Sequence, residues 1–311
     1  MKTEIDNSKY PLVSVVTINY DHPEVTCAML ETLTKVTYPN IEIIVVDNAS
    51  PNDDPSIIKE RFPDIIFIQS EKNLGFPGGN DLGIRQSKGK YILLLNNDTE
   101  VTESFLEPLV DKMEYDDNIG IVSPKIKFYD PPQLIQYAGI TPINLLTIRS
   151  KGIGFEEVDK GQYEKDTMQA YAHGAAMMVR REAIEKVGMM ADIYFLYYEE
   201  LDWCYRIRQA GYTIWYVHNS LIYHKESVST GRLSPFRTYY INRSRWLYMR
   251  RHVKGFRLVL AIIYQLFAAF PKNSLFFILK GDFKSLKAYW RAFAWIIIHW
   301  NNKKIFENPK L

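Results

Sequence analysis

Cysteine is nearly absent from this chain, which has only Cys27 and Cys204 among its 311 residues. The two lie far apart and in no metal-ligand spacing, so we expect neither a disulfide scaffold nor a cysteine-ligated metal. The polar, acidic segment of residues 1–7 contains no apolar stretch of the signal-peptide type. A reducing, cytoplasmic location is therefore the simplest expectation.

A strong excess of one charge is also missing. The chain has 38 lysines and arginines against 36 aspartates and glutamates, for a formal net charge of +2. Its bulk charge therefore does not indicate a nucleic-acid partner, and none is expected. Because 47% of the residues are hydrophobic, a sizeable core can form, and the length favours one main domain with an appendage.

Residues 12–125 alternate between strand-like and helix-like patterns. Short apolar runs predict strands at residues 12–18, 41–46, 65–68 and 91–95, with helices between them at residues 23–33, 57–61 and 80–87. Gly75, Gly78 and Gly79 predict a turn that opens the third helix. This alternation is typical of an α/β fold with a mostly parallel central sheet and flanking helices.

Polar side chains follow the predicted strands at the points where the strands end. Asn19 follows the first strand, residues 47–50 (Asp-Asn-Ala-Ser) follow the second, and residues 96–98 (Asn-Asn-Asp) follow the fourth. Any one of these could be an ordinary cap or turn former. Because ligands bind beyond the carboxyl ends of such strands, their recurrence at one edge of the sheet favours a binding crevice.

The motifs at residues 45–50 (Val-Val-Asp-Asn-Ala-Ser), 73–80 (Asn-Leu-Gly-Phe-Pro-Gly-Gly-Asn) and 94–98 (Leu-Leu-Asn-Asn-Asp) occur in a recognisable order. In this order they resemble the family 2 inverting glycosyltransferases, and the rhamnosyltransferase-like branch most of all. The resemblance implies a GT-A fold over residues 1–240, with a donor half at about 10–125 and an acceptor half at about 126–240.

By this resemblance, the donor half binds a nucleotide-diphospho-sugar. Asp47 would accept a hydrogen bond from the pyrimidine base, a contact that a carboxylate can make. Glycines after Asn73 would let the backbone approach the donor closely, because they carry no Cβ. The residues expected on the donor side are Asn19, Asp47, Asn48, Asn73, Gly75, Gly79 and Asn97.

The family's Asp-x-Asp metal motif corresponds here to residues 96–98, where the first acid is replaced by Asn96. Asp98 alone therefore offers a charge to Mn²⁺ or Mg²⁺, while Asn96 could present a neutral oxygen. A histidine that completes the family's metal shell corresponds to His224. One carboxylate can suffice because these ions take much of their shell from phosphates and water.

The second cluster lies at residues 195–206, where Glu199, Glu200 and Asp202 follow an aromatic run. Acids at a helix N-terminus could simply complement the helix dipole. The segment nevertheless resembles the family's Glu-Asp-x-Asp motif, whose second acid is the catalytic base. Glu200 is therefore the first candidate and Glu199 the second. The residues expected on the acceptor side are His173, Gly174, Asp202 and Trp203.

One base without an enzyme nucleophile implies inversion at the anomeric carbon. The expected acceptor is a hydroxyl of a glycan or lipid-linked glycan in cell-surface polysaccharide synthesis. Rhamnose from dTDP-rhamnose is the expected donor sugar, on the family branch alone. The alternatives are a non-catalytic relative that binds nucleotide-sugar or glycan, and a sugar nucleotidyltransferase. The latter should carry a basic glycine-rich loop after its first strand, where this chain has residues 19–22 (Asn-Tyr-Asp-His).

Residues 241–311 are basic and rich in aromatic side chains, and they predict a helical appendage. One apolar segment, residues 258–270, is expected to stop at Pro271, and a second spans residues 289–300. Neither reaches the roughly 20 apolar residues that span a bilayer. Residues 241–300 could lie on the inner face of the plasma membrane as a peripheral element, or could pack on the catalytic domain.

Overall fold

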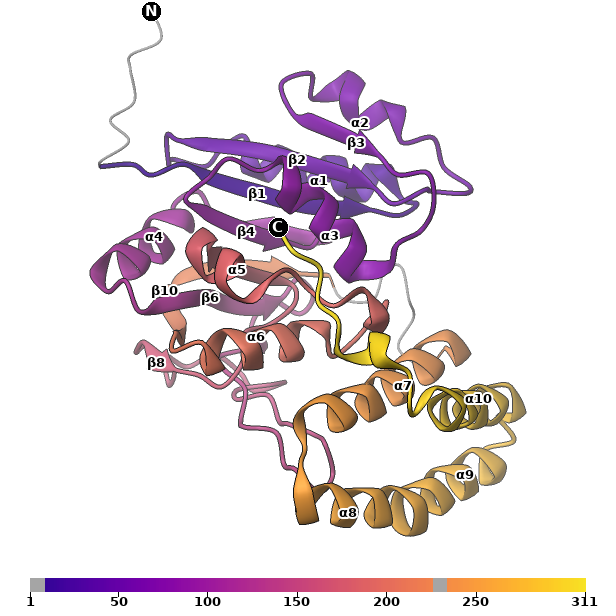
Figure 1. Ribbon diagram of the computed structural model, residues 1–311. Helices are drawn as coiled ribbons and strands as arrows, with labels where there is room; N and C mark the ends of the chain where they lie inside the picture. Colours follow the sequence, from indigo (N-terminus) through magenta and orange to yellow (C-terminus); the bar gives the residue numbers. More distant parts are fainter. Residues whose placement is uncertain (1–8, 226–233) are drawn as a thin grey trace, which may run out of the picture.

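The computed structural model describes residues 9–225 and 234–311, so the polar N-terminal segment of residues 1–7 lies outside the described part. One ten-stranded sheet forms the centre of the molecule, and a group of helices lies beside it (Figure 1). The main path of the sheet has the strand order β3-β2-β1-β4-β9-β6-β10-β5, with β7 paired to β6 and β8 to β10.

The first half of the sheet forms as the apolar runs predict. Its strands are β1 (Val13–Asn19), β2 (Ile41–Asp47), β3 (Ile66–Gln69) and β4 (Tyr91–Leu95). They are connected by α1 (Pro23–Leu33), α2 (Ser56–Arg61) and α3 (Gly75–Gln86). All pairs among these four strands are parallel. Asn19 lies beside Asp47 in the register of β1 and β2, so the polar strand ends do meet at one edge.

The second half of the sheet is mixed. Its strands are β5 (Thr99–Val101), β6 (Ile119–Phe128), β7 (Ile135–Tyr137), β8 (Thr167–Met168), β9 (Ala176–Arg180) and β10 (Thr213–His224). Strand β9 lies antiparallel between β4 and β6, whereas β6 and β10 are parallel. The sheet as a whole is therefore mixed, with its parallel part confined mainly to the first half.

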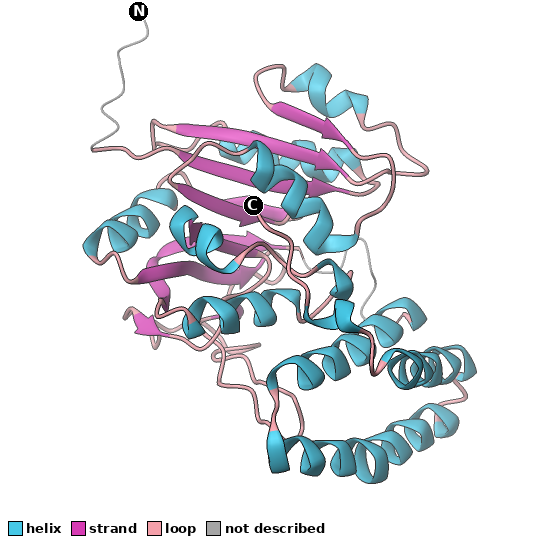
Figure 2. Ribbon diagram, viewed as in Figure 1, coloured by secondary structure: helices cyan, strands magenta, loops and turns pink. Residues whose placement is uncertain are grey.

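Helices cover both faces of the sheet (Figure 2). The second half contributes α4 (Leu106–Tyr115), α5 (Arg181–Val187), the 3-10 helix η1 (Asp192–Tyr194) and α6 (Glu199–Gln209). Within β1 the side chains alternate, so Val13 and Val15 join the core cluster on one face while Val16 joins the cluster on the other. This period of two is expected of a strand buried on both sides.

Helix α3 begins earlier than the sequence predicted, at Gly75 instead of residue 80. Gly78 and Gly79 lie inside the helix and not in a turn before it. The reason is close packing: a Cβ on Gly79 would lie 2.9 Å from Ile18 Cδ1, and one on Gly83 would lie 2.3 Å from Val16 Cγ1. The glycines therefore let α3 approach β1 more closely than a helix with side chains could.

The appendage consists of α7 (Pro235–His252), α8 (Gly255–Tyr264), the π-helical turn η2 (Gln265–Ala269), α9 (Phe270–Leu279), α10 (Phe283–His299) and the 3-10 helix η3 (Lys303–Phe306). Helix α7 crosses residue 240, the expected boundary of the domain. After η3 the chain returns to the main domain, where the N–H of Met189 donates to the carbonyl of Pro309 at 2.8 Å.

The predicted stop at Pro271 is wrong, because α8, η2 and α9 form one continuous helix over Gly255–Leu279. Proline lacks an N–H and its ring crowds the carbonyl of the preceding turn. The wider π-helical turn at Gln265–Ala269, directly before the proline, provides the room for it. By length and composition, this 25-residue helix could cross a membrane, although only 17% of its most apolar window is buried.

The contact between α3 and β1 yields a test of the packing. We expect Gly83→Ala to lower the free energy of unfolding by about 1–3 kcal/mol, because overpacking against Val16 outweighs the better helix propensity of alanine. Urea unfolding measures the change. In a Val16→Ala background the added methyl has room, so the same substitution should cost less. An equal cost in both backgrounds would contradict the packing explanation.

Candidate active site

A cavity of about 790 Å³ opens at the carboxyl edge of the parallel strands, between the two halves of the sheet. Most of the residues predicted for the site line it: Asn48, Asn73, Gly75, Asn96, Asn97, Asp98, His173, Gly174, Glu199, Glu200 and His224. The predicted residues that do not line it are Asn19, Asp47, Gly79, Asp202 and Trp203. The predicted residues that line the cavity come from six segments of the chain, whereas the five that do not line it are buried.

Asp47 lies beneath the cavity with no exposed surface. One of its oxygens accepts hydrogen bonds from Asn19 Nδ2 at 2.8 Å and Ser50 Oγ at 2.5 Å. The other accepts from Gln69 Nε2 at 2.5 Å and from the N–H of Ser50 at 3.1 Å. The carboxylate thus shapes the turn after β2, and a contact with a nucleotide base would require Gln69 or Ser50 to move away.

The amide of Asn19 continues this buried network. Its Oδ1 accepts from Thr26 Oγ1 at 2.7 Å, and Thr26 in turn accepts from Asn97 Nδ2 at 2.9 Å. Asn19 therefore fixes Asn97 at the cavity wall through Thr26 and does not reach the cavity itself.

Asn48 connects the end of β2 to the loop before α3. Its Nδ2 donates to the carbonyl of Gly75 at 3.1 Å and to Asn73 Oδ1 at 3.2 Å, and its Oδ1 accepts from the N–H of Leu74 at 2.9 Å. Gly75 has a φ of +71°, and a Cβ there would lie 2.2 Å from the carbonyl oxygen of Phe195. Only glycine fits where the donor-half loop approaches this loop of the second half.

Asp98 and His224 converge on one point of the cavity wall. Asp98 Oδ1 lies 2.9 Å from His224 Nε2. The His224 side chain is 7% exposed and the Asp98 side chain 11%. His224 Nδ1 lies 2.8 Å from Gln136 Oε1. Because an amide oxygen only accepts, Nδ1 carries the proton in this hydrogen bond, and Nε2 is the ring nitrogen that faces Asp98.

This arrangement fits a divalent cation. Asp98 Oδ1 accepts no other hydrogen bond among the residues that the structure describes, so a carboxylate oxygen and an imidazole nitrogen, both common metal ligands, lie side by side. Two adjacent ligands at about 2.1 Å from an octahedral ion lie about 3 Å apart, which matches the observed distance. In residues 9–225 and 234–311, no group of three or more histidine, cysteine, aspartate or glutamate ligands occurs. A bound cation would need further ligands, such as the oxygens of a diphosphate.

Asn96 lies at the edge of this pair, where its Nδ2 is 3.5 Å from His224 Nε2. The structure thus places the three predicted metal residues together. Gln136, on β7, was missed, because a buried glutamine outside any motif gives no sequence signal. Its role depends on the pairing of β7 with β6, which brings it beside the end of β10.

Glu199 and Glu200 begin α6 after a sharply bent loop. Phe195, Tyr197 and Tyr198 all have positive φ angles, which are uncommon for residues other than glycine. Such backbone persists only where its surroundings hold it. Here the carbonyl of Phe195 accepts from the N–H of Phe76 at 2.8 Å, so this bend is fixed against the donor half.

The two glutamates differ in their protonation. Burial raises the pKa of Glu200 to about 7, although three backbone N–H groups of the helix start lower it. Burial, and then the charge of Glu200, raise the pKa of Glu199 well above its usual range. Oε2 of Glu199 has no hydrogen-bond partner in the described part of the chain. Near neutral pH, Glu199 is therefore protonated, and Glu200 is the carboxyl that can change its charge.

His173 and Gly174 line the cavity beside the start of α6. Burial, and then the charge of His224, lower the pKa of His173 to about 3, so its ring is neutral. Its Nδ1 accepts from the N–H of Ala175 at 3.1 Å, which leaves Nε2–H as a donor. A Cβ on Gly174 would lie 3.8 Å from Glu200 Cγ. The glycine therefore keeps the space beside Glu200 open.

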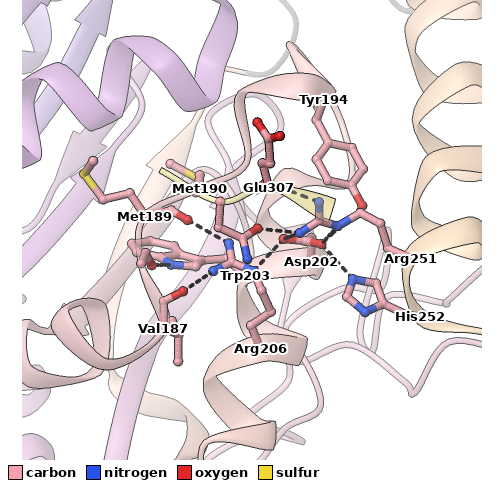
Figure 3. A network of polar contacts seen from close by, with 12 residues as sticks. Val187, Met189, Met190, Tyr194, Asp202, Trp203, Arg206, Arg251, His252 and Glu307 are labelled. Atoms are coloured by element: carbon pink, nitrogen blue, oxygen red, sulfur yellow. Dashed lines mark hydrogen bonds and ion pairs between the residues drawn. The ribbon is translucent and has the colours of Figure 1, made fainter. Parts of the chain in front are cut away.

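Asp202 and Trp203 lie in the core behind the cavity, and not on its acceptor side as expected. Asp202 is fully buried and contacts Arg206 Nε at 2.8 Å, Arg251 Nε at 2.6 Å and His252 Nε2 at 2.7 Å (Figure 3). Trp203 is fully buried too, and its indole donates to the carbonyl of Gly188 at 2.9 Å. Because residues three and four positions apart share a helix face, Asp202 and Trp203 lie on the same buried side of α6 as Glu199.

Residues 14–188 match the sequence model of the family described as Glycosyl transferase family 2. A low-salt glycan biosynthesis hexosyltransferase of Haloferax volcanii is 28% identical over 246 residues, which cover 76% of this chain and 74% of that protein. An N-acetylglucosaminyl-diphospho-decaprenol L-rhamnosyltransferase of Mycobacterium tuberculosis is 22% identical over 244 residues, which cover 71% of this chain and 78% of that relative.

Two solved structures have a similar fold. The mannosyltransferase PcManGT from Pyrobaculum calidifontis, solved with GDP-Man and Mn²⁺, has a TM-score of 0.57 and 15% identity, covering 97% of this chain and 91% of that one. GalNAc-T7, solved with UDP, GalNAc and Mn²⁺, has a TM-score of 0.64 and 16% identity, covering 94% and 58%. At these identities the likeness shows the fold alone, and it confirms the expected GT-A fold.

The Asp202 cluster yields a stability prediction. We expect Asp202→Asn to lower the free energy of unfolding by about 3–5 kcal/mol, because it leaves the buried guanidinium groups of Arg206 and Arg251 without a counter-charge. Chemical denaturation measures the loss. Asp117→Asn is the matched control, since Asp117 also contacts an arginine, Arg180, but its side chain is 94% exposed. An exposed pair contributes about 1 kcal/mol or less.

The same variant has a defined pH dependence. Burial alone would raise the pKa of Asp202, but the hydrogen bond from His252 and the charges of Arg206 and Arg251 hold it well below its usual range. A lowered folded-state pKa stabilises the protein above the unfolded value of about 3.9. The deficit of Asp202→Asn should thus stay constant above about pH 5 and shrink below about pH 4. A deficit that grows on acidification would contradict this account.

Proposed function

Since the chain belongs to glycosyl transferase family 2, whose model covers residues 14–188, we propose that it transfers a sugar from a nucleotide-diphosphate donor to a hydroxyl of a glycan, with inversion at the anomeric carbon. The observation that carries this proposal is that a candidate metal site and a candidate general base line the same cavity. The Asp98–His224 pair lies on one wall and Glu200 on another. A volume of about 790 Å³ is in the range of small-molecule sites.

Asp98 and His224 are the residues that would hold a divalent cation, Mn²⁺ or Mg²⁺, with Asn96 beside them. When bound, such an ion would neutralise negative charge on the leaving diphosphate. Gln136 fixes His224 in the tautomer that presents Nε2 to the ion. Asn48 and Gly75 shape the loop where the backbone would approach the donor.

Glu200 is the proposed general base that removes the proton from the acceptor hydroxyl. A base works best with a pKa near the working pH, and burial gives Glu200 a pKa of about 7. The pKa of Glu199 is raised well above its usual range, so Glu199 is protonated where Glu200 titrates and cannot serve as the base. With one base and no nucleophile assigned, a single displacement follows, and the configuration inverts.

The donor we propose is dTDP-rhamnose, and the acceptor is a glycan or lipid-linked glycan of a cell-surface polysaccharide. Support comes from the motif resemblance and from the similarity to a protein named as a rhamnosyltransferase, at 22% identity. His173, whose Nε2–H is left as a donor in the lining of the cavity, is the candidate for contact with the sugar or the acceptor. A cytoplasmic site of action accords with a nucleotide-sugar donor.

The two glutamates can be separated by paired variants. We expect Glu200→Gln to lower kcat by about 100- to 10,000-fold, the typical contribution of a general base. Glu199→Gln keeps a neutral side chain of the same shape, so its kcat should stay within about tenfold of the wild type. Release of nucleotide diphosphate from a panel of dTDP-, UDP- and GDP-sugars measures both. The reverse ranking would assign the base to Glu199.

The pH profile follows from the raised pKa of Glu200. A base acts in its ionised form, so kcat/KM should rise with pH and level off above about pH 7. A profile that is flat between about pH 5 and pH 8 would contradict this role. If the donor binds but no donor in the panel turns over, even with a lipid extract as the source of acceptors, a non-catalytic binding protein becomes the better proposal.

Metal dependence is tested through Gln136. We expect EDTA to abolish transfer and Gln136→Leu to weaken Mn²⁺ binding by about 10- to 100-fold, because His224 loses the partner that fixes its tautomer. The paramagnetic resonance of free Mn²⁺, titrated in the presence of nucleotide diphosphate, measures binding without catalysis. Gln133→Leu is the matched control, since Gln133 is exposed. Equal Mn²⁺ affinity in both variants would contradict the proposed shell.

A further inference from the structure

The continuous helix over Gly255–Leu279 carries two opposite faces. Its buried residues recur every four or five positions, at Ala261, Gln265, Ala269 and Ser274. In the first half of the helix, the exposed large apolar residues follow a separate helical stripe: Phe256 at 73%, Val259 at 49%, Leu260 at 41%, Ile263 at 48% and Phe267 at 76%. Such spacing places the second set on one face of the helix.

The apolar face continues along the rest of the appendage. Beyond the π-helical turn, exposed positions include Leu275, Phe276, Ile278 and Leu279, the last at 78%. On α10 the exposed apolar residues Phe283, Trp290 and Ile297 are seven positions apart and so share one side. A soluble monomer rarely leaves an apolar surface of this extent uncovered.

The charged residues along the same segment are almost all basic. Between residues 254 and 299 there are seven lysines and arginines and a single acid, Asp282. Those that are exposed include Lys272, Lys280, Lys284, Lys287 and Arg291. Lys287 and Arg291 also border an apolar groove of about 480 Å³ between α9 and α10, which is lined by Phe270, Phe283 and Trp290. Apolar side chains beside basic ones are complementary to acyl chains beneath anionic headgroups.

The buried stripe shows how this helix is oriented on the protein. Gln265 Nε2 donates to the carbonyl of Thr147 at 3.1 Å, so the middle of the helix is attached to the acceptor half of the main domain. Figure 1 shows α8 and α9 running along the outside of the appendage, with α7 and α10 on their inner side. A helix attached to the domain at its midpoint, with one face covered and the other bare, fits a position in the plane of a membrane surface better than one across it.

We propose that the exposed face of α8 and α9 inserts into the surface of an anionic lipid bilayer. This insertion would hold the cavity close to the membrane. The attachment also lies near the catalytic helix. Thr147 and Ile148 belong to one loop, and Tyr198, directly before Glu199, donates to the carbonyl of Ile148 at 2.7 Å. Leu145 and Leu146, which precede Thr147, are 37% and 43% exposed and extend the apolar surface. A lipid-linked acceptor could thus reach the acceptor side from the bilayer.

Flotation of the full-length protein with lipid vesicles tests this surface. We expect binding to vesicles with about 30% phosphatidylglycerol, and much weaker binding to phosphatidylcholine alone or at high salt. The double variant Ile263→Glu with Phe267→Glu should lower the partition coefficient by at least about tenfold, because it places two charges on the inserted face. Phe256→Glu is a second, single variant at a residue that is 73% exposed.

Tyr115→Glu is the matched control. Tyr115 is an aromatic residue on α4 that is 84% exposed, away from the appendage, and its variant should bind vesicles as the wild type does. Thermal unfolding checks that each variant is folded. Vesicle binding requires neither donor nor acceptor, so its failure and the failure of glycosyl transfer are separate results.

Four outcomes would overturn the proposal. One is the absence of flotation with anionic vesicles, and another is equal flotation of the wild type and the charged variants. Retention of the protein in vesicles after alkaline carbonate washing would show a helix that spans the bilayer and not one lying in its surface. A lipid-free dimer that both charged variants dissociate would assign the face to a second copy of the chain.

Discussion

The buried carboxylate of Asp202 is the constraint on which the second half of the site depends. A buried charge is tolerated only where partners compensate it, and the partners here come from distant parts of the chain. Arg206 belongs to the same helix, whereas Arg251 and His252 come from α7. Arg251 also donates to Ile305 and Asn308 of the C-terminal tail. One ion cluster therefore holds α6, α7 and the tail in fixed positions.

The first turn of α6 gives three acids three different environments. Asp202 faces guanidinium groups and stays ionised, while burial and the neighbouring Glu200 raise the pKa of Glu199 well above its usual range. Glu200 lies between these extremes, beside Gly174 at the cavity. Carboxyl groups with separated pKa values are a common basis for acid–base chemistry. The structural role of Asp202 and the chemical role proposed for Glu200 thus follow from the two sides of one helix.

Local patterns were enough to predict much of the fold. Apolar runs of strand length predicted the parallel half of the sheet, and polar residues after these runs predicted part of the cavity lining, because parallel strands end at the same edge. Asp98 and His224 met as predicted from the motif, although 126 positions separate them. The burial of Asp47 could not be predicted, because its partner Gln69 comes from a neighbouring strand.

Features that depend on tertiary contacts could not be predicted from local sequence patterns. The early start of α3 depends on how closely Gly79 and Gly83 approach β1, and the helix through Pro271 depends on a π-helical turn before it. Asp202 looked like a site residue because its acidic neighbours share its motif. Its partners Arg251 and His252 lie 49 and 50 positions away, in a basic segment for which the sequence left open a membrane contact or packing on the catalytic domain.

The stereochemistry of the released sugar tests the central claim most directly. When the enzyme hydrolyses its donor slowly in the absence of acceptor, proton NMR can identify the anomer that forms before mutarotation. A single displacement, with Glu200 as the base and no covalent intermediate on the enzyme, predicts a first-formed sugar with the configuration opposite to that of the donor. A first-formed sugar that keeps the donor's configuration would contradict the account and require a nucleophile in the cavity.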